Sequence, residues 1–118
     1  MRKFLRGFMY AANGMRSASA ERNMRIHYMV ALFVIIAGYV FGISKLEWMA
    51  CLLSISLIFA LETVNTAIER LCNRITLEND NSIKEIKDIA AGAVLLAAIG
   101  VTVVGLIVFV PYIIELFK

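Results

Sequence analysis

The sequence predicts an all-α membrane protein with an N-terminal amphipathic helix on the membrane surface and three transmembrane helices. Of its 118 residues, 61% are hydrophobic and 18% are charged, whereas apolar residues make up about 45–50% of soluble domains. The apolar residues fall into three long runs, and the single proline leaves no stretch typical of a linker. We therefore expect one membrane domain over residues 1–118.

Residues 1–22 are expected to form the surface helix. One side of this helix is apolar and carries Phe4, Leu5, Phe8, Met9, Ala11, Ala12 and Met15. The opposite side carries Arg2, Lys3, Arg6, Tyr10 and Asn13. A helix of this kind lies in the membrane surface, with its basic side toward headgroups or water. A signal peptide is the alternative, but Gly7, Asn13 and Gly14 interrupt the apolar core that it needs.

Three spans are expected, at residues 26–43, 46–74 and 83–114. The first is just long enough to cross the hydrocarbon, and a short polar turn around Lys45 follows it. The second is apolar only as far as Leu61 and continues as a helix at the membrane edge. Asn81 or Ser82 is expected to cap the third, which Pro111 can end or kink.

The distribution of basic residues predicts the orientation of the chain. Six of the twelve lie before residue 26 and four lie between residues 70 and 87, whereas the 44–47 turn and the C-terminal end hold one each. Because basic residues are enriched in cytoplasmic loops, we expect the N-terminus in the cytoplasm and the C-terminus outside. The net charge of +3 is then an orientation signal rather than a sign of nucleic-acid binding.

Three polar residues interrupt the apolar pattern of the second span. Glu62, Asn65 and Glu69 lie within about 60° on one helix face. An acid at the bilayer centre costs about 2.5–3.5 kcal/mol, and less near an interface, so we expect this face to be functional. Glu62 lies deeper and is a candidate general base, whereas Glu69 and Glu21 are candidate magnesium ligands. The alternative is an interhelical hydrogen-bond cluster.

Two further charges enter the membrane at the start of the third span. Lys87 is a candidate contact to phosphate, and Asp88 a candidate contact to a nucleotide or its metal-bound water. A solvated interface is the preferred interpretation of four neighbouring charges, Lys84, Glu85, Arg70 and Arg74. His27 is interpreted as a membrane-edge residue. The sequence lacks the motifs of P-loop, Rossmann, zinc-hydrolase and Ser-His-Asp enzymes, so its oxygen-rich groups favour magnesium and phosphoryl transfer.

The third span also carries a stripe of small residues, Ala90, Ala93, Ala97 and Gly100. Such stripes let helices approach closely. Because three helices cannot easily enclose several buried acids, an oligomer is expected.

Three segments carry motifs in a fixed order. They are ERNMRIH at residues 21–27, LETVNTAIE at residues 61–69 and KDIAAGAV at residues 87–94. Together they resemble the small integral-membrane bacterial diacylglycerol kinase family, over nearly the whole chain. The first motif is similar to the Gram-positive branch, whose members are typically undecaprenol kinases.

The resemblance implies a homotrimer with active sites between neighbouring protomers. It implies that Glu62 is the base toward a lipid hydroxyl and that Asn65 orients the site. It also implies that MgATP is held by Glu21 and Glu69 at the metal and by Lys87, Asp88, Tyr10, Lys3 and Arg6 at the nucleotide. One position departs from the family, because Asn73 stands where an Asp is usual, and this bears on the strength of ATP binding.

The function expected from these observations is ATP-dependent phosphorylation of a lipid alcohol at the cytoplasmic side of a bacterial membrane. Undecaprenol, giving undecaprenyl phosphate, is the favoured acceptor, and diacylglycerol, giving phosphatidic acid, is the alternative. A non-enzymatic structural or transport subunit is the alternative from another class. It is disfavoured because Tyr112 is the only ionisable residue between Ala90 and Ile114, which leaves no continuous proton path.

Overall fold

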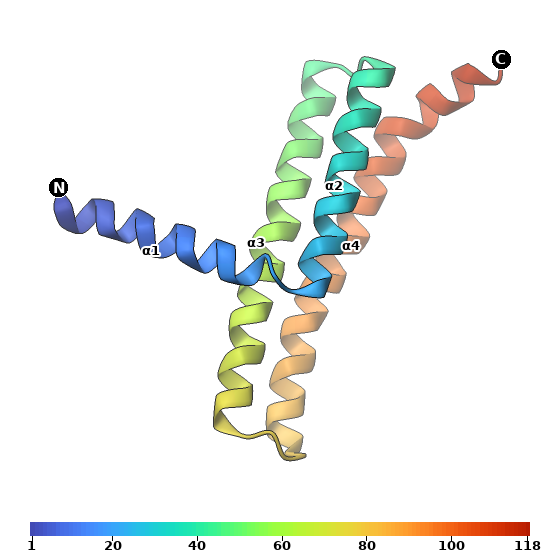
Figure 1. Cartoon of the computed structure of the whole chain (residues 1–118). Coiled ribbons are helices and arrows are strands. Elements are labelled where there is room, and N and C mark those ends of the chain that lie inside the picture. The colour runs from blue at the N-terminus through green and yellow to red at the C-terminus, as the bar shows by residue number, and fades with distance from the viewer.

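The computed structural model describes residues 1–118 as four helices joined by short connections (Figure 1). In chain order they are α1 (Arg2–Ala18), α2 (Arg22–Phe41), α3 (Lys45–Ile75) and α4 (Asn81–Leu116). The last three are each long and apolar enough to cross a membrane. The chain is therefore an all-helical, multi-pass membrane protein.

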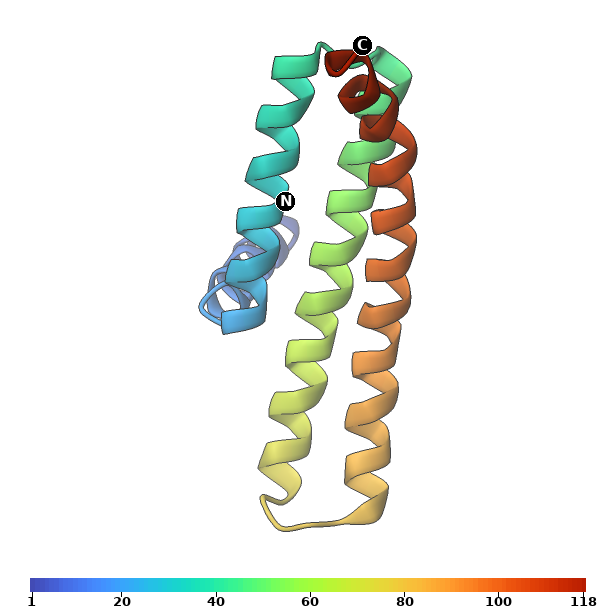
Figure 2. The same cartoon turned by 90° about the vertical axis from the view of Figure 1, so that its right-hand side faces the viewer.

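Helices α3 and α4 lie side by side over most of their length and form the main contact of the bundle (Figures 1 and 2). Helix α2 packs against the N-terminal half of α3, which is the half away from the α3–α4 loop (Figure 1). Helix α1 projects away from the bundle and meets it only at its C-terminal end (Figure 1). The chain thus consists of a three-helix bundle with one extended arm.

The observed helix ends differ slightly from those expected. α4 is capped by Asp80, whose Oδ1 accepts hydrogen bonds from the backbone N–H groups of Ser82 at 2.9 Å and Ile83 at 3.0 Å. The prediction that Asn81 or Ser82 forms this cap was wrong, because the Asp80 carboxylate already satisfies the first backbone donors. Pro111 does not end the helix, which continues to Leu116.

The turn between α2 and α3 is tightly specified. Gly42 ends α2 in the left-handed conformation at φ 61°, which favours glycine. Ser44 then begins α3 with reciprocal hydrogen bonds, because its hydroxyl accepts from the Glu47 backbone and the Glu47 carboxylate accepts from its own backbone. The Tyr112 hydroxyl donates to the same carboxylate. Hydrogen bonds between α3 and α4 thereby stabilise the end of the bundle opposite the α3–α4 loop.

Few side chains are buried within the single chain. Only 14 of its 118 residues are buried, and large apolar side chains such as Leu53, Leu96 and Ile107 remain about 70% exposed. In a soluble protein this exposure would be a liability. In a membrane these faces are covered by lipid or by other helices.

Gly38 gives a stability prediction, because a Cβ at this position would lie 2.7 Å from Cη2 of Trp48. Gly38→Ala should therefore lower the free energy of unfolding by about 1–3 kcal/mol and shift the emission of Trp48, the only tryptophan. Thermal unfolding followed by tryptophan fluorescence measures both. The control is Gly7→Ala, where no atom lies within 4 Å and stability should not fall. Equal effects of the two variants would contradict close packing at Gly38.

Candidate functional site

Glu62 is the most deeply buried acid in the chain. Its residue is 3% exposed and lies on the face of α3 that looks toward α2. Its Oε2 lies 3.4 Å from Nε2 of His27, which projects from α2. Burying a carboxylate without a partner is costly, so the imidazole is the group that makes this position tenable.

Asn65 continues the polar face one turn further along α3. Its Nδ2 donates to Oε1 of Glu69 at 3.4 Å, across one helical turn. Its Oδ1 is buried and has no hydrogen-bond partner. Because buried acceptors are normally satisfied, this free oxygen marks a place where a ligand group can bind.

Glu21 lies at the junction of α1 and α2 and is held by Arg70 of α3. Nη2 of Arg70 lies 2.8 Å from Oε1 of Glu21 and 3.1 Å from the Ser17 carbonyl oxygen, while Nη1 donates to the Ser17 hydroxyl at 2.6 Å. Arg70 is exposed, and its guanidinium joins three acceptors at this surface. This contact fastens the end of α1 to α3.

The charges at the start of α4 pair locally. Lys87 Nζ donates to Oδ1 of Asn73 on α3 at 2.6 Å. Asp88 Oδ2 lies 2.7 Å from Nζ of Lys84, one turn earlier on the same helix. Because Asn73 is neutral, the positive charge of Lys87 has no carboxylate within salt-bridge distance.

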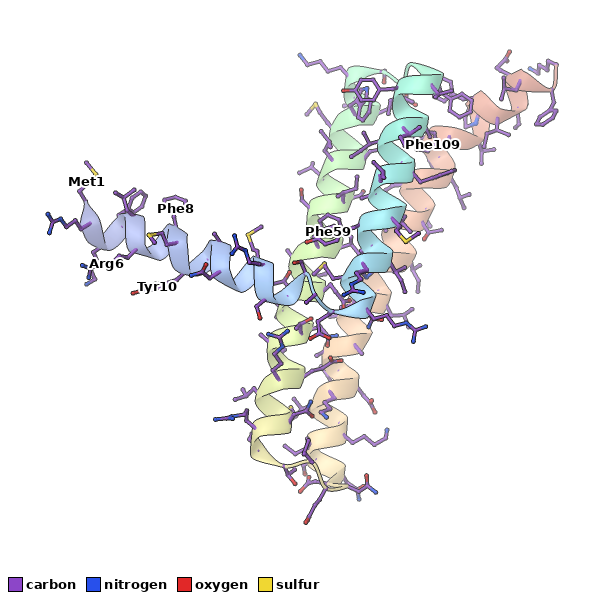
Figure 3. The ribbon with its side chains drawn as sticks, in the orientation of Figure 1. Met1, Arg6, Phe8, Tyr10, Phe59 and Phe109 are labelled. Carbon is purple, nitrogen blue, oxygen red and sulfur yellow. The ribbon has the colours of Figure 1, made fainter.

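The residues expected on α1 are not brought to the others within one chain. Arg6 and Tyr10 lie on the part of the arm that is remote from the bundle (Figure 3), and Tyr10 is 70% exposed. Lys3 lies one turn nearer the N-terminus, on the same exposed arm. In the single chain the predicted nucleotide contacts are therefore divided between α1 and α4.

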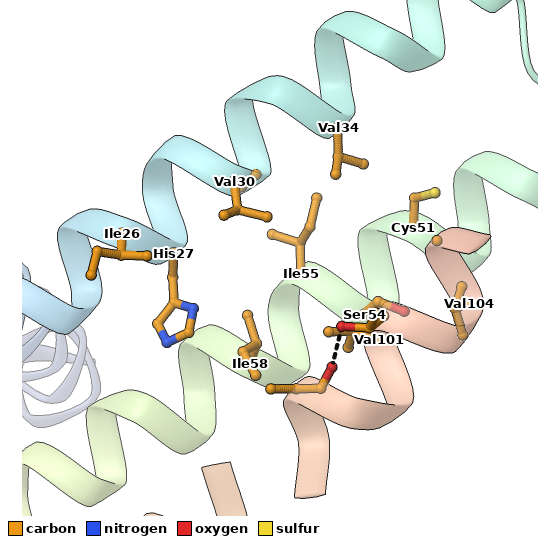
Figure 4. A pocket seen from close by; sticks show the side chains of 14 residues that line it. Ile26, His27, Val30, Val34, Cys51, Ser54, Ile55, Ile58, Val101 and Val104 are labelled. Atoms are coloured by element: carbon orange, nitrogen blue, oxygen red, sulfur yellow. Dashed lines mark hydrogen bonds between the residues drawn. The ribbon is translucent and has the colours of Figure 1, made fainter. Parts of the chain in front are cut away.

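An apolar groove of about 360 Å³ lies between α2, α3 and α4. Val30 and Val34 of α2, Ile55 and Ile58 of α3 and Val101 of α4 are among the side chains that line it (Figure 4). His27 lies near one end and points toward α3 (Figure 4). The groove is thus suited to an apolar chain, and its polar end adjoins Glu62.

The side chains around Asn65 suit a magnesium ion in their chemistry. The unpartnered Oδ1 of Asn65 and the Glu69 carboxylate are oxygen ligands of the kind that Mg²⁺ prefers. No three His, Cys, Asp or Glu side chains gather in the single chain. A magnesium site that also binds phosphates needs only one or two protein carboxylates, so these residues fit the ion.

The fold and the site define a class of protein, a small multi-pass membrane protein with an oxygen-rich site beside an apolar groove. Residues 9–109 match the family described as prokaryotic diacylglycerol kinase. The chain is 38% identical over 112 residues to the undecaprenol kinase of Bacillus subtilis, which covers 94% of this chain and 91% of that relative. The chain therefore belongs to the prokaryotic diacylglycerol kinase family, and it is a lipid kinase.

A second relative is the diacylglycerol kinase of Synechocystis sp., which is 35% identical over 111 residues. The match covers 92% of this chain but 63% of that relative. The chain thus spans less than two thirds of the Synechocystis protein, whereas it matches nearly the full length of the Bacillus one.

Sequence reasoning missed three features of the site. His27 was interpreted as a membrane-edge residue, and nothing in the one-dimensional pattern places it against Glu62. The groove and the contacts of Arg70 were also not foreseen. A single histidine at the start of a span, in the same chain as a membrane-depth acid, was the available signal for the first.

The Arg70 contacts lead to a prediction about the arm. Arg70→Ala removes the donors to Ser17 and Glu21, so tryptic cleavage after Arg16 should become several times faster. The free energy of unfolding should change by less than about 1 kcal/mol, because this ion pair is half-exposed. Arg74→Ala, at an exposed arginine of the same helix, is the matched control. An unchanged cleavage rate in Arg70→Ala would show that α1 is held by other contacts.

Proposed function

We propose that this lipid kinase transfers the γ-phosphate of ATP to the primary hydroxyl of undecaprenol. The observation that carries the proposal is the buried Glu62 carboxylate beside an apolar groove whose end is His27. A polyprenyl chain is long and wholly apolar, and the groove walls are almost entirely apolar. The relative matched over nearly its whole length is named undecaprenol kinase, which supports the same acceptor.

The chemistry assigned to Glu62 is removal of the hydroxyl proton. As the acceptor oxygen forms its bond to the γ-phosphorus, the bond from that phosphorus to the β–γ bridging oxygen breaks, and ADP leaves. The proton passes to the Glu62 carboxylate, and no covalent enzyme intermediate forms. Asn65 orients the site through its amide, whose free oxygen is available to a ligand.

The nucleotide is assigned to the charged residues nearer the α3–α4 loop. Lys87 contacts phosphate with a charge that no carboxylate neutralises, and Asp88 contacts the nucleotide. Glu21 and Glu69 hold magnesium, which neutralises phosphate charge when it is bound. Tyr10, Lys3 and Arg6 of α1 complete the nucleotide pocket.

Those three residues of α1 favour an assembly, because within one chain they lie on the arm and not near Lys87. A homotrimer with shared sites would bring the arm of one protomer toward the bundle of another. The large apolar faces left exposed on α2, α3 and α4 agree with such contacts. The excess of basic residues near the N-terminus and on the ends of α3 and α4 that flank their connecting loop favours a cytoplasmic N-terminus and a C-terminus outside.

Diacylglycerol remains the second candidate acceptor, because the Synechocystis relative is named diacylglycerol kinase. Purified protein in lipid vesicles, given labelled ATP, magnesium and both alcohols in competition, separates the two. We expect label to appear mainly in undecaprenyl phosphate. Label found mainly in phosphatidic acid would assign diacylglycerol, and label in neither product would refute the kinase assignment.

Glu62→Gln tests the base. It should lower kcat by about 10²–10⁴-fold and leave MgATP binding intact, because the amide cannot take the proton. Glu69→Gln should instead raise the KM for MgATP. Glu85→Gln, at an exposed acid on α4, is the control and should change neither constant. Loss of MgATP binding in Glu62→Gln would move Glu62 to the metal.

Asn73→Asp tests the charge state of Lys87. A carboxylate at this position would pair with the ammonium group that Asn73 now contacts, so Lys87 would attract phosphate less strongly. The Kd for MgATP should rise by up to about 5-fold, the equivalent of a surface pair of about 1 kcal/mol. Calorimetric titration measures it, with the exposed Asn23→Asp as the charge-matched control. Tighter binding in Asn73→Asp would contradict a direct phosphate contact from Lys87.

A further inference from the structure

His27 both lines the apolar groove and lies against the buried acid. It is the only histidine in the chain, it lines the groove, and its Nε2 lies 3.4 Å from Oε2 of Glu62. Glu62 itself does not line the groove. The imidazole is therefore the polar group of the groove that lies nearest the carboxylate.

The chemistry of the two groups fixes how they interact. A carboxylate is only an acceptor, so a favourable interaction with Oε2 needs a hydrogen on Nε2 of His27; the 3.4 Å separation is that of an ion pair and is not one of the hydrogen bonds of the chain. The imidazole lies against Oε2, and neither oxygen of Glu62 accepts a hydrogen bond within the chain. A base with one oxygen facing the imidazole presents the other to a single incoming hydroxyl.

The groove walls beside this pair supply no other donor to Glu62. The α4 wall of the groove consists of Ala98, Val101, Thr102, Val104 and Gly105. The Thr102 hydroxyl already donates to the Ala98 carbonyl at 2.7 Å. Ser54 and Ile58 of α3 line the same space without a hydrogen bond to Glu62. His27 is thus the one ion-pair partner that the chain gives the Glu62 carboxylate.

We propose that His27 is a positioning residue of the transfer reaction. It holds Oε2 of Glu62 so that Oε1 faces the acceptor hydroxyl, and its ring forms the polar stop at the end of the groove. The role rests on the function proposed above. It requires a hydrogen-bond donor at the place of Nε2 and does not require an imidazole as such.

Three substitutions of His27 test whether a donor at the right distance from Glu62 is sufficient or whether an imidazole ring is needed. Glutamine places an amide N–H close to the position of Nε2, asparagine carries the same group but falls short of Glu62, and leucine removes it. In full-length protein in lipid vesicles, His27→Asn and His27→Leu should lower kcat by about 100-fold, the cost of misplacing a reacting group by about 1 Å. His27→Gln should stay within about 5-fold of the wild type. The KM for MgATP should be unchanged in all three.

Ser56→Ala is the matched control, since Ser56 is an exposed serine of the same helix as Glu62 that does not line the groove, and its kcat should remain at the wild-type value. Thermal unfolding checks that each variant is folded. His27→Asn keeps a polar side chain beside Glu62 and is expected to fold. It therefore still tests the role of His27 if His27→Leu does not fold.

Two outcomes would overturn the role of His27 while leaving the kinase assignment intact. One is an active wild type with unchanged kcat in His27→Asn, which would make the pair purely structural. The other is a folded His27→Gln as impaired as His27→Asn, which would show that a donor at this place is not sufficient. An inactive wild type would instead overturn the proposed function, and this inference with it.

Discussion

The burial of the Glu62 carboxylate in a membrane helix is the constraint on which the rest of the site depends. A charged acid in this setting is tolerated only beside a suitable partner, and His27 of α2 is that partner. The contact fixes which face of α2 meets α3. On one side of the His27–Glu62 contact, the apolar groove lies between the three spanning helices. On the other side, the polar face of α3 continues through Asn65 to Glu69.

Two groups of polar contacts between helices, one on each side of this pair along α3, stabilise the bundle. Arg70 binds Ser17 and Glu21, which fixes the point where α1 leaves the bundle. At the far end, Glu47 accepts from both the α3 N-terminus and Tyr112 of α4. Between them lie the polar face of Glu62 and Asn65 and, nearer Glu47, the mostly apolar side chains that line the groove. A rigid frame around an open cavity is the arrangement that a lipid-binding enzyme needs.

The family relationship and the geometry answer different questions. The matches to lipid kinases establish the class of reaction, whereas the contacts show how the side chains of this chain are arranged. Asn73 leaves the charge of Lys87 without a carboxylate partner, and His27 lies against the buried acid. Both features lie next to residues assigned to the chemistry. They are therefore the positions on which the proposed phosphate contact and the proposed base depend.

The sequence by itself determined the helical class, the three spans and the polar face of Glu62, Asn65 and Glu69, because hydropathy and the 100° helical period are local properties. Only the tertiary structure decided that His27 meets Glu62 and that Arg70 reaches Ser17, 53 positions away. These contacts depend on how each helix is rotated and where it crosses its neighbour. That information lies in side-chain packing between segments and leaves no period in the sequence.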